Sequence, residues 1–230
     1  MISKNSASSR AIPTSKMIQR VRDDPAFPIH WGANVSGMSA REEVHEPMAA
    51  WGLWREALDS ALRIAEEMRE MSLHKQVVNR ILEPFSYITV IASATDWDNF
   101  FALRDHPDAQ PEMQMLAKMM KSAYNESTPK LRRPGEWHLP LIDEDDYFST
   151  EEWPKVSAGR CARVSYLTHD GKRDWREDIK LYEKLTSSIP MHASPLEHPA
   201  VALDSSERTG NFTGWMQLRK IVEREKRVHP

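Results

Sequence analysis

The sequence predicts a chain that mixes α-helices with β-strands, and two patterns carry this expectation. From about residue 49 to residue 71, apolar side chains recur at helical spacing with charged residues between them, which predicts the longest helix. The β-branched run at residues 87–91 predicts a strand, although so short an apolar stretch also fits a buried helix. A further short strand is expected within residues 137–141, so the chain is not purely helical.

Shorter helices are predicted along the rest of the chain. The same periodicity marks residues after Pro13, residues 74–82 before Pro84, the aromatic segment after Asp96, residues 112–124 and a charged stretch around residues 175–185. Thr95 or Asp96 would cap the third of these helices. Residues 127–156 are rich in proline and acidic side chains and predict a long irregular excursion, a kind of segment that is usually functional or poorly ordered.

Composition excludes several classes of protein. The single cysteine, Cys161, excludes an internal disulfide framework and a zinc site built on two cysteines, and its apolar neighbours favour a small buried side chain over a nucleophile. A net charge of −3 with interspersed acids and bases argues against a nucleic-acid binder. The longest apolar run is too short to span a membrane, and no signal peptide is evident. We expect one cytoplasmic domain over residues 1–230.

Two polar clusters in the first half of the chain are suited to binding. Residues 3–10 (SKNSASSR) combine hydroxyls, an amide and a guanidinium, which are donors for phosphate, although a serine-rich terminus is also often disordered. On the predicted helix 74–82, Gln76, Asn79 and Arg80 form one polar stripe. Such a stripe suits the edge of a heterocycle, and a plain solvated helix face is the alternative.

Two further segments combine side chains of interest. Asn99 and Arg104 flank an aromatic stripe, and we expect Arg104 to be partly buried against an anion, with Glu83 or Asp108 as internal alternatives. Residues 192–198 (HASPLEH) carry two histidines and a glutamate whose spacing matches no known metal motif. We therefore predict no metal site, and a metal hydrolase using His192 and His198 is a distant alternative.

Together these clusters resemble the flavin-dependent thymidylate synthases, whose signature is RHRxxSxNExSxR. Ser3, Asn5, Ser8 and Arg10 match the signature's Ser, Asn, Ser and Arg, whereas Ser6 stands where Glu is usual. The Arg-His-Arg part of the signature would precede Met1, so the resemblance implies a single domain whose N-terminal strand and first signature residues are missing.

Later segments extend the resemblance in an unusual order. NRILEPF and TDWDNFFALR are similar to the family's central stretch, with Arg80, Asn99 and Arg104 at the matching positions. CARVSY through HASPLEH is similar to the stretch that opens other members but comes last here, and GWMQLRK is loosely similar to the lead-in to the signature. This order is typical of a permuted, bacteriophage-type subgroup.

The resemblance implies a fold and a reaction. The fold would be α+β, with a helical layer that includes residues 49–71 packed on a small, mainly antiparallel sheet. NADPH would reduce FAD, 5,10-methylenetetrahydrofolate would supply one carbon, and the reduced flavin would deliver hydride to dUMP, giving dTMP without a cysteine nucleophile. Members are homotetramers whose sites are shared between subunits, which suits a chain rich in Trp and Met.

The resemblance also assigns roles to individual residues. Arg104 would be the catalytic residue, holding the pyrimidine and favouring ionisation at its N3. The dUMP phosphate would be bound by Ser8, Ser9 and Arg10 with help from Arg80, and Gln76 would contribute less certainly to the site. The flavin would be lined by Asn5, Asn99, His192 and Ser194, with Gln217 as a weaker expectation. A truncated or catalytically impaired nucleotide-binding relative and a purely structural oligomer are the alternatives.

Overall fold

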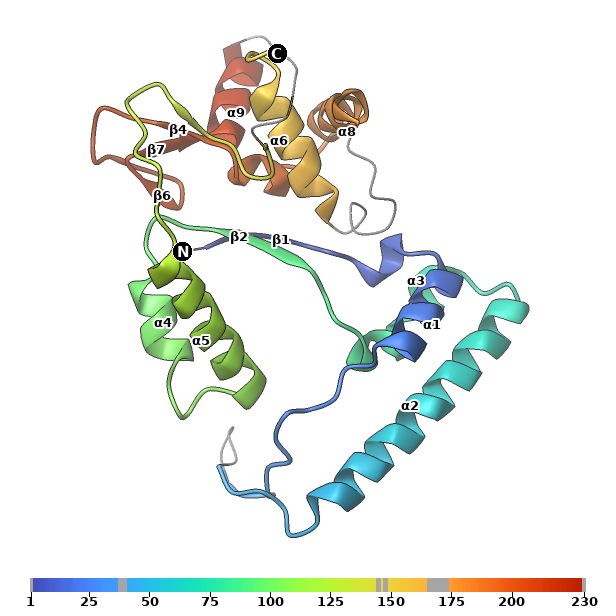
Figure 1. The fold of residues 1–230 in the computed structure, drawn as a ribbon. Helices are drawn as coiled ribbons and strands as arrows, with labels where there is room; N and C mark the ends of the chain where they lie inside the picture. Colours follow the sequence, from blue (N-terminus) through green and yellow to red (C-terminus); the bar gives the residue numbers. More distant parts are fainter. Residues whose placement is uncertain (1, 37–40, 144–145, 147–148, 165–173, 229–230) are drawn as a thin grey trace. The chain divides into compact units, whose positions relative to one another are not determined.

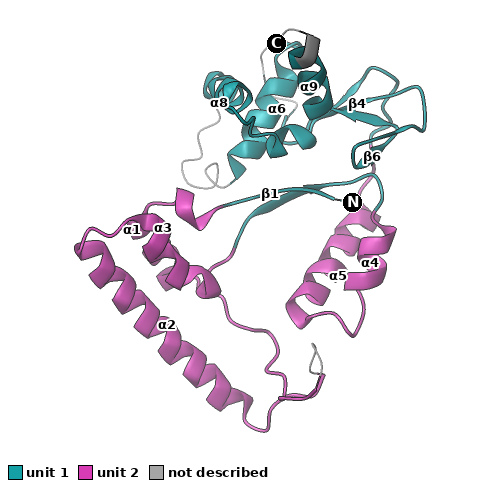
Figure 2. Ribbon diagram, turned by 180° about the vertical axis from the view of Figure 1, so that it is seen from behind, with its two compact units in different colours: residues 1–7, 88–96, 130–230 teal, residues 8–87, 97–129 magenta. Residues whose placement is uncertain are grey.

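A computed structural model describes residues 2–36, 41–143, 146, 149–164 and 174–228 (Figure 1). The chain divides into two compact units, each made of segments that are separate in the sequence (Figure 2). Unit 1 comprises Met1–Ala7, Ile88–Asp96 and Lys130–Pro230, and unit 2 comprises Ser8–Tyr87 and Trp97–Pro129. A single domain over the whole chain stays a prediction.

Unit 2 is built from helices. In chain order they are the 3₁₀ turn η1 (Ser9–Ala11), α1 (Thr14–Asp23), α2 (Pro47–Glu70), α3 (Lys75–Val78), the 3₁₀ helix η2 (Asn79–Phe85), α4 (Asp98–Arg104) and α5 (Pro111–Glu126). The long helix predicted over residues 49–71 and the helix predicted over residues 112–124 are both confirmed, since apolar periodicity over several turns is a strong signal. The helix predicted after Pro13 is confirmed as α1.

The core of unit 2 explains where α2 packs. Leu58 and Ala65 of α2 lie in one buried cluster with Val21 of α1 and with Leu82 and Phe85 of η2. The apolar stripe of α2 therefore packs within unit 2 against α1, α3 and η2. That a helical layer including residues 49–71 packs on a sheet stays a prediction. All the strands that the structure describes belong to unit 1.

Three local predictions need correction. The helix expected over residues 74–82 is α3 followed by η2, because the chain tightens into a 3₁₀ helix that contains Pro84. The N-cap of α4 is Trp97 rather than Thr95 or Asp96, and its side chain caps nothing. The strand expected at residues 87–91 is β2, Val90–Ser93. It begins three residues later than expected because β1, its pairing partner, pairs with residues 90–93.

Unit 1 contains small antiparallel sheets together with helices. β1 (Ser3–Ser6) pairs with β2, with Ser3 opposite Ser93 and Ser6 opposite Val90. A three-stranded sheet has the order β3 (Trp137–His138), β4 (Ala200–Ala202), β7 (Trp215–Gln217), and β5 (Arg208–Thr209) pairs with β6 (Phe212–Thr213). The helices are α6 (Trp153–Ala162), α8 (Trp175–Ser187), the 3₁₀ turn η3 (Ser194–Glu197) and α9 (Leu218–Val228). The predicted α+β class is confirmed at this level.

Helices α6 and α8 pack closely at a glycine. A Cβ built on Gly159 of α6 would clash with the backbone carbonyl of Asp178 in α8. Beside this crossing the side chains of Arg160 and Asp178 are fully buried and paired, with Nε to Oδ2 at 3.2 Å. Arg163 donates to the other carboxylate oxygen of Asp178 at 2.8 Å, so the buried acid is compensated by two guanidinium groups.

No helix among the described residues is both long enough and apolar enough to cross a membrane.

Candidate functional site

The turn that carries Ser8, Ser9 and Arg10 is the first candidate site. Ser8 is extended, with φ of −118°, and its carbonyl accepts the N–H of Ala11 at 2.9 Å, which closes the 3₁₀ turn η1. Ser8 and Ser9 are half-buried and Arg10 is exposed. The hydroxyl of Ser8 and the guanidinium of Arg10 are therefore held on a compact, hydrogen-bonded turn in unit 2.

Asn79 fastens this turn to the body of unit 2. Its Nδ2 donates to the carbonyl oxygens of Ser9 at 2.7 Å and Ile12 at 2.9 Å, and its side chain is fully buried. Lys75 adds a hydrogen bond from Nζ to the carbonyl of Ala11 at 3.1 Å. The prediction that Asn79 belongs to an exposed polar stripe is wrong, because α3 ends at Val78 and the 3₁₀ turn that follows directs Asn79 inward.

Gln76 and Arg80 remain exposed on either side of this buried asparagine. Helix α3, which carries Gln76, and η2, which carries Arg80, both contact the turn η1. One contact opposes phosphate binding at Ser9, because the Ser9 hydroxyl donates to the carboxylate of Glu83.

Arg104 and Asn99 both lie on α4 in unit 2, and both are exposed. The expectation that Arg104 is partly buried is wrong, since Phe101 fills the inward side of this short helix. Neither proposed internal partner pairs with Arg104: Asp108 pairs with Arg41, and Glu83 accepts the Ser9 hydroxyl. In the part of the chain that the structure describes, the Arg104 guanidinium makes no ion pair and is open to a ligand.

The second candidate site lies in unit 1, where Asn5 of β1 meets Ser194 of η3. The Ser194 hydroxyl donates to Oδ1 of Asn5 at 3.4 Å, and Nδ2 of Asn5 donates to the carbonyl of Cys161 at 2.7 Å. Ser194 and His192 are exposed, and the backbone N–H of His192 is held by the carbonyl of Leu185 at 3.1 Å. Three residues that the resemblance assigns to the flavin, Asn5, His192 and Ser194, thus lie on neighbouring segments.

Beneath this site a buried polar network joins β1 to η3. Nε2 of Gln217 donates to Oγ of Ser3 at 3.1 Å and to the carbonyl of Glu197 at 2.8 Å. Gln217 is almost fully buried, so it supports the site and does not contact a ligand. Its position before the last helix offered no sequence signal for this role.

His198, which the sequence offered only as a distant candidate metal ligand, is a second buried polar group in unit 1. Its Nδ1 hydrogen-bonds with Oγ of Ser93 at 2.9 Å, while Nε2 is buried and finds no partner among the described residues. Burial lowers the pKa of His198 from 6.5 to about 4, which keeps the ring neutral at ordinary pH. His198 is enclosed whereas His192 is exposed, and no group of three His, Cys, Asp or Glu side chains placed to hold a metal occurs in the described parts of the chain.

Cys161 is fully buried at the end of α6, and burial raises the pKa of its thiol to about 12. The expectation of a small buried side chain is confirmed for this residue. A thiol this protonated is a poor nucleophile. Residues 165 and 166, at the end of the CARVSY segment, lie outside the described residues.

None of the protein-family models, curated proteins or solved structures compared with the chain matches it.

Proposed function

We propose that the chain is a flavin-dependent thymidylate synthase, which methylates dUMP to dTMP with FAD, NADPH and 5,10-methylenetetrahydrofolate. The contact between Asn5 and Ser194 carries the proposal. These residues are 189 positions apart, and the motif resemblance assigns each to the flavin separately. Two motifs matched by chance would have no reason to meet in the folded chain.

The donors in unit 1 fit a flavin. An isoalloxazine ring presents oxygen and nitrogen atoms along one edge, and the exposed Ser194 hydroxyl and His192 imidazole offer hydrogen-bonding groups. Both polar atoms of the Asn5 side-chain amide are engaged within the protein, Oδ1 as an acceptor and Nδ2 as a donor, so Asn5 orients Ser194 more than it contacts a ligand. FAD, when bound, supplies the hydride transfer that no side chain provides. Asn99, which the resemblance also assigns to the flavin, lies on α4 of unit 2 and is exposed.

The groups in unit 2 fit a nucleotide monophosphate. The Ser8 hydroxyl and the guanidinium groups of Arg10 and Arg80 provide charge-assisted donors for a phosphate dianion. Arg104, exposed and without an ion pair among the described residues, provides a cation for the pyrimidine ring. Such a cation stabilises negative charge at N3 and so favours attack on the one-carbon unit.

We also propose a homotetramer. Several large apolar side chains are exposed on α2 and α5, where a monomer in water would leave them unpaired. They include Met48, Leu53 and Met71 on or beside α2 and Met115, Leu116 and Met119 on α5. An obligate interface between copies of the chain would cover such residues.

A catalytically impaired nucleotide-binding relative is the second candidate. The contact that favours it is the hydrogen bond from Ser9 to Glu83, which places a carboxylate on the turn proposed to bind phosphate. Ser6, which stands where the family has Glu, also favours the impaired relative. This candidate shares both binding sites and lacks turnover.

The proposal is tested by the flavin absorbance spectrum of the purified full chain, with added FAD, before and after dUMP. We expect FAD to remain bound through gel filtration and its spectrum to change when dUMP is added. Ser194→Ala should weaken FAD binding, whereas Arg10→Gln should weaken dUMP binding about 10-fold and leave FAD in place. Arg69→Gln, an exposed arginine at the end of α2, serves as the matched control for charge.

The outcomes separate the candidates. Production of dTMP with NADPH and methylenetetrahydrofolate supports the synthase, and binding of FAD and dUMP without dTMP supports the impaired relative. A chain that takes up no FAD contradicts both. Size-exclusion chromatography with light scattering tests the tetramer, and a monomeric mass at assay concentration rules it out.

A further inference from the structure

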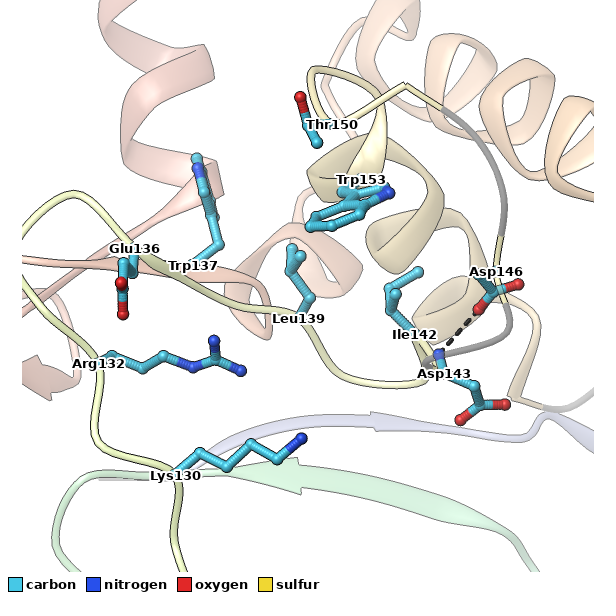
Figure 3. Close-up of a pocket in the computed structure, with 10 residues that line it drawn as sticks. All are labelled: Lys130, Arg132, Glu136, Trp137, Leu139, Ile142, Asp143, Asp146, Thr150 and Trp153. Carbon is cyan, nitrogen blue, oxygen red and sulfur yellow. Dashed lines mark hydrogen bonds between the residues drawn. The ribbon is translucent and has the colours of Figure 1, made fainter.

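Unit 1 contains a pocket of about 470 Å³ that is separate from the residues proposed to bind FAD and dUMP (Figure 3). It is formed by the excursion between residues 130 and 153, which no motif of the sequence explains. A volume of this size falls within the range of small-molecule sites, roughly 300–1,000 Å³. Its lining includes the apolar side chains Trp137, Leu139, Ile142 and Trp153 and the basic side chains Lys130 and Arg132.

The wall of the pocket is anchored by buried side chains of α6. Arg160, fully buried, donates from Nη1 to the carbonyl of Leu141 at 2.7 Å and makes a two-point ion pair with Asp146 at 2.6 and 2.7 Å. Ser157 donates to the carbonyl of Pro140 at 2.7 Å. Since bidentate guanidinium pairs are strong and directional, these contacts hold Pro140, Leu141 and Asp146 in place against α6.

The lining is suited to a flat ring. Trp137 comes from β3 and Trp153 from the first turn of α6, and both indoles are partly buried. Leu139 and Ile142 lie between and beside them in Figure 3 and add an aliphatic surface. Indole faces stack on other aromatic rings, with a gain beyond simple burial.

The opposite side of the pocket is suited to an acid. Lys130 and Arg132 lie on this side, and both side chains extend toward Ile142 and Asp143 (Figure 3). Arg132 makes no ion pair within the described ranges of the chain. Two of the nearby carboxylates are already engaged, since Asp146 pairs with Arg160 and Oε2 of Glu136 accepts the backbone N–H of Arg133 at 2.9 Å.

We propose that this pocket binds a small molecule that combines a flat aromatic ring with an acidic substituent. The ring lies against Trp137 and Trp153, and the acid lies beside Lys130 and Arg132. Two sources share this chemistry, the aminobenzoylglutamate portion of a folate and an adenosine monophosphate unit. Both sources are fragments of molecules used in the proposed reaction, so the identity of the ligand rests on the proposed function, whereas the pocket itself needs neither flavin nor dUMP.

Isothermal titration calorimetry of the full chain with p-aminobenzoyl-L-glutamate, and separately with adenosine 5′-monophosphate, tests the site. We expect at least one probe to bind with a dissociation constant below about 1 mM. Arg132→Gln should weaken that binding about 10-fold, because one charge-assisted hydrogen bond is lost. Arg133→Gln is the matched control, since Arg133 is adjacent and exposed but does not line the pocket.

Each outcome decides for or against the site. Preference for one probe identifies the source, and selective loss in Arg132→Gln supports the proposal. Failure of both probes to bind the unaltered chain overturns it, and so does an equal loss in the two arginine variants, which would indicate non-specific attraction. FAD uptake measured in Arg132→Gln should match the unaltered chain, so failure of the pocket and failure of the synthase proposal are distinguishable.

Discussion

The buried amide of Asn79 holds Ser9 by its backbone, with Nδ2 donating to the Ser9 carbonyl at 2.7 Å, and the two residues are 70 positions apart. The same nitrogen also holds Ile12. A single side chain in the core of unit 2 therefore sets the conformation of the turn that carries Ser8 and Arg10. The proposed phosphate site depends on a residue that a ligand does not touch.

Asn79→Ala should destabilise the chain and weaken dUMP binding together. The change removes the Asn79 donor from the buried Ile12 carbonyl and leaves the Ser9 carbonyl with the Ile12 N–H, and we expect a loss of about 2 kcal/mol in the free energy of unfolding. Denaturant titration and dUMP binding measure the two effects. Asn125→Ala, an exposed polar residue of α5, should change neither quantity. Unaltered dUMP affinity in folded Asn79→Ala would contradict a positioning role.

Gly159 and Gly52 should respond in opposite directions to alanine. At Gly159 the new methyl meets the carbonyl of Asp178, and overpacking of this kind costs about 1–3 kcal/mol. At Gly52, on the exposed side of α2, nothing lies within 4 Å, and helix propensity predicts a gain of about 1 kcal/mol. The midpoints of urea unfolding test both, and a stabilised Gly159→Ala would mean that α6 and α8 are not in close contact.

His198 should make the stability of the chain depend on pH between 6.5 and about 4. Its pKa is lowered in the fold by burial, with Glu197 and His138 as charged or titratable neighbours, so the unfolded chain binds the proton first as pH falls. Stability is thus full above pH 6.5 and is lost progressively down to about pH 4.

The difference between a pKa of 6.5 in the unfolded chain and about 4 in the fold corresponds to a loss on the order of 3 kcal/mol in the free energy of unfolding. Carboxylates titrate in the same range, so the measurement is a comparison of pH-dependent unfolding in the unaltered chain and in His198→Gln, which cannot titrate. The variant should show the shallower decline. His45→Gln, at an exposed histidine, should keep the full decline, and identical curves for His198→Gln and the unaltered chain would refute the assignment.

Cys161 should be inert in the folded chain. Burial and a thiol pKa of about 12 leave almost no thiolate at pH 8. A thiol-labelling reagent should therefore react with one equivalent of cysteine in denaturant and with negligible amounts under native conditions. Rapid native labelling would show that the end of α6 opens.

Local patterns were enough to predict most helices and the mixed fold class. Helices α2, α5 and α8 follow from apolar side chains that recur over several turns, because that spacing is a property of the segment alone. The short elements were predicted less well. A four-residue strand such as β2 has no length over which a period can be read, and its bounds depend on pairing with β1.

The amino-acid sequence by itself determined the helical segments, the lone cysteine and the motif positions Ser8, Arg10, Arg80 and Ser194. Only the tertiary structure decided which of them meet. In the folded chain Asn79 is buried, Arg104 is exposed, and Asn5 contacts Ser194. A pocket is lined by residues between 130 and 153, where the sequence shows no motif. The physical reason is that burial and hydrogen bonding between residues far apart depend on how whole segments pack, and no local spacing records that information.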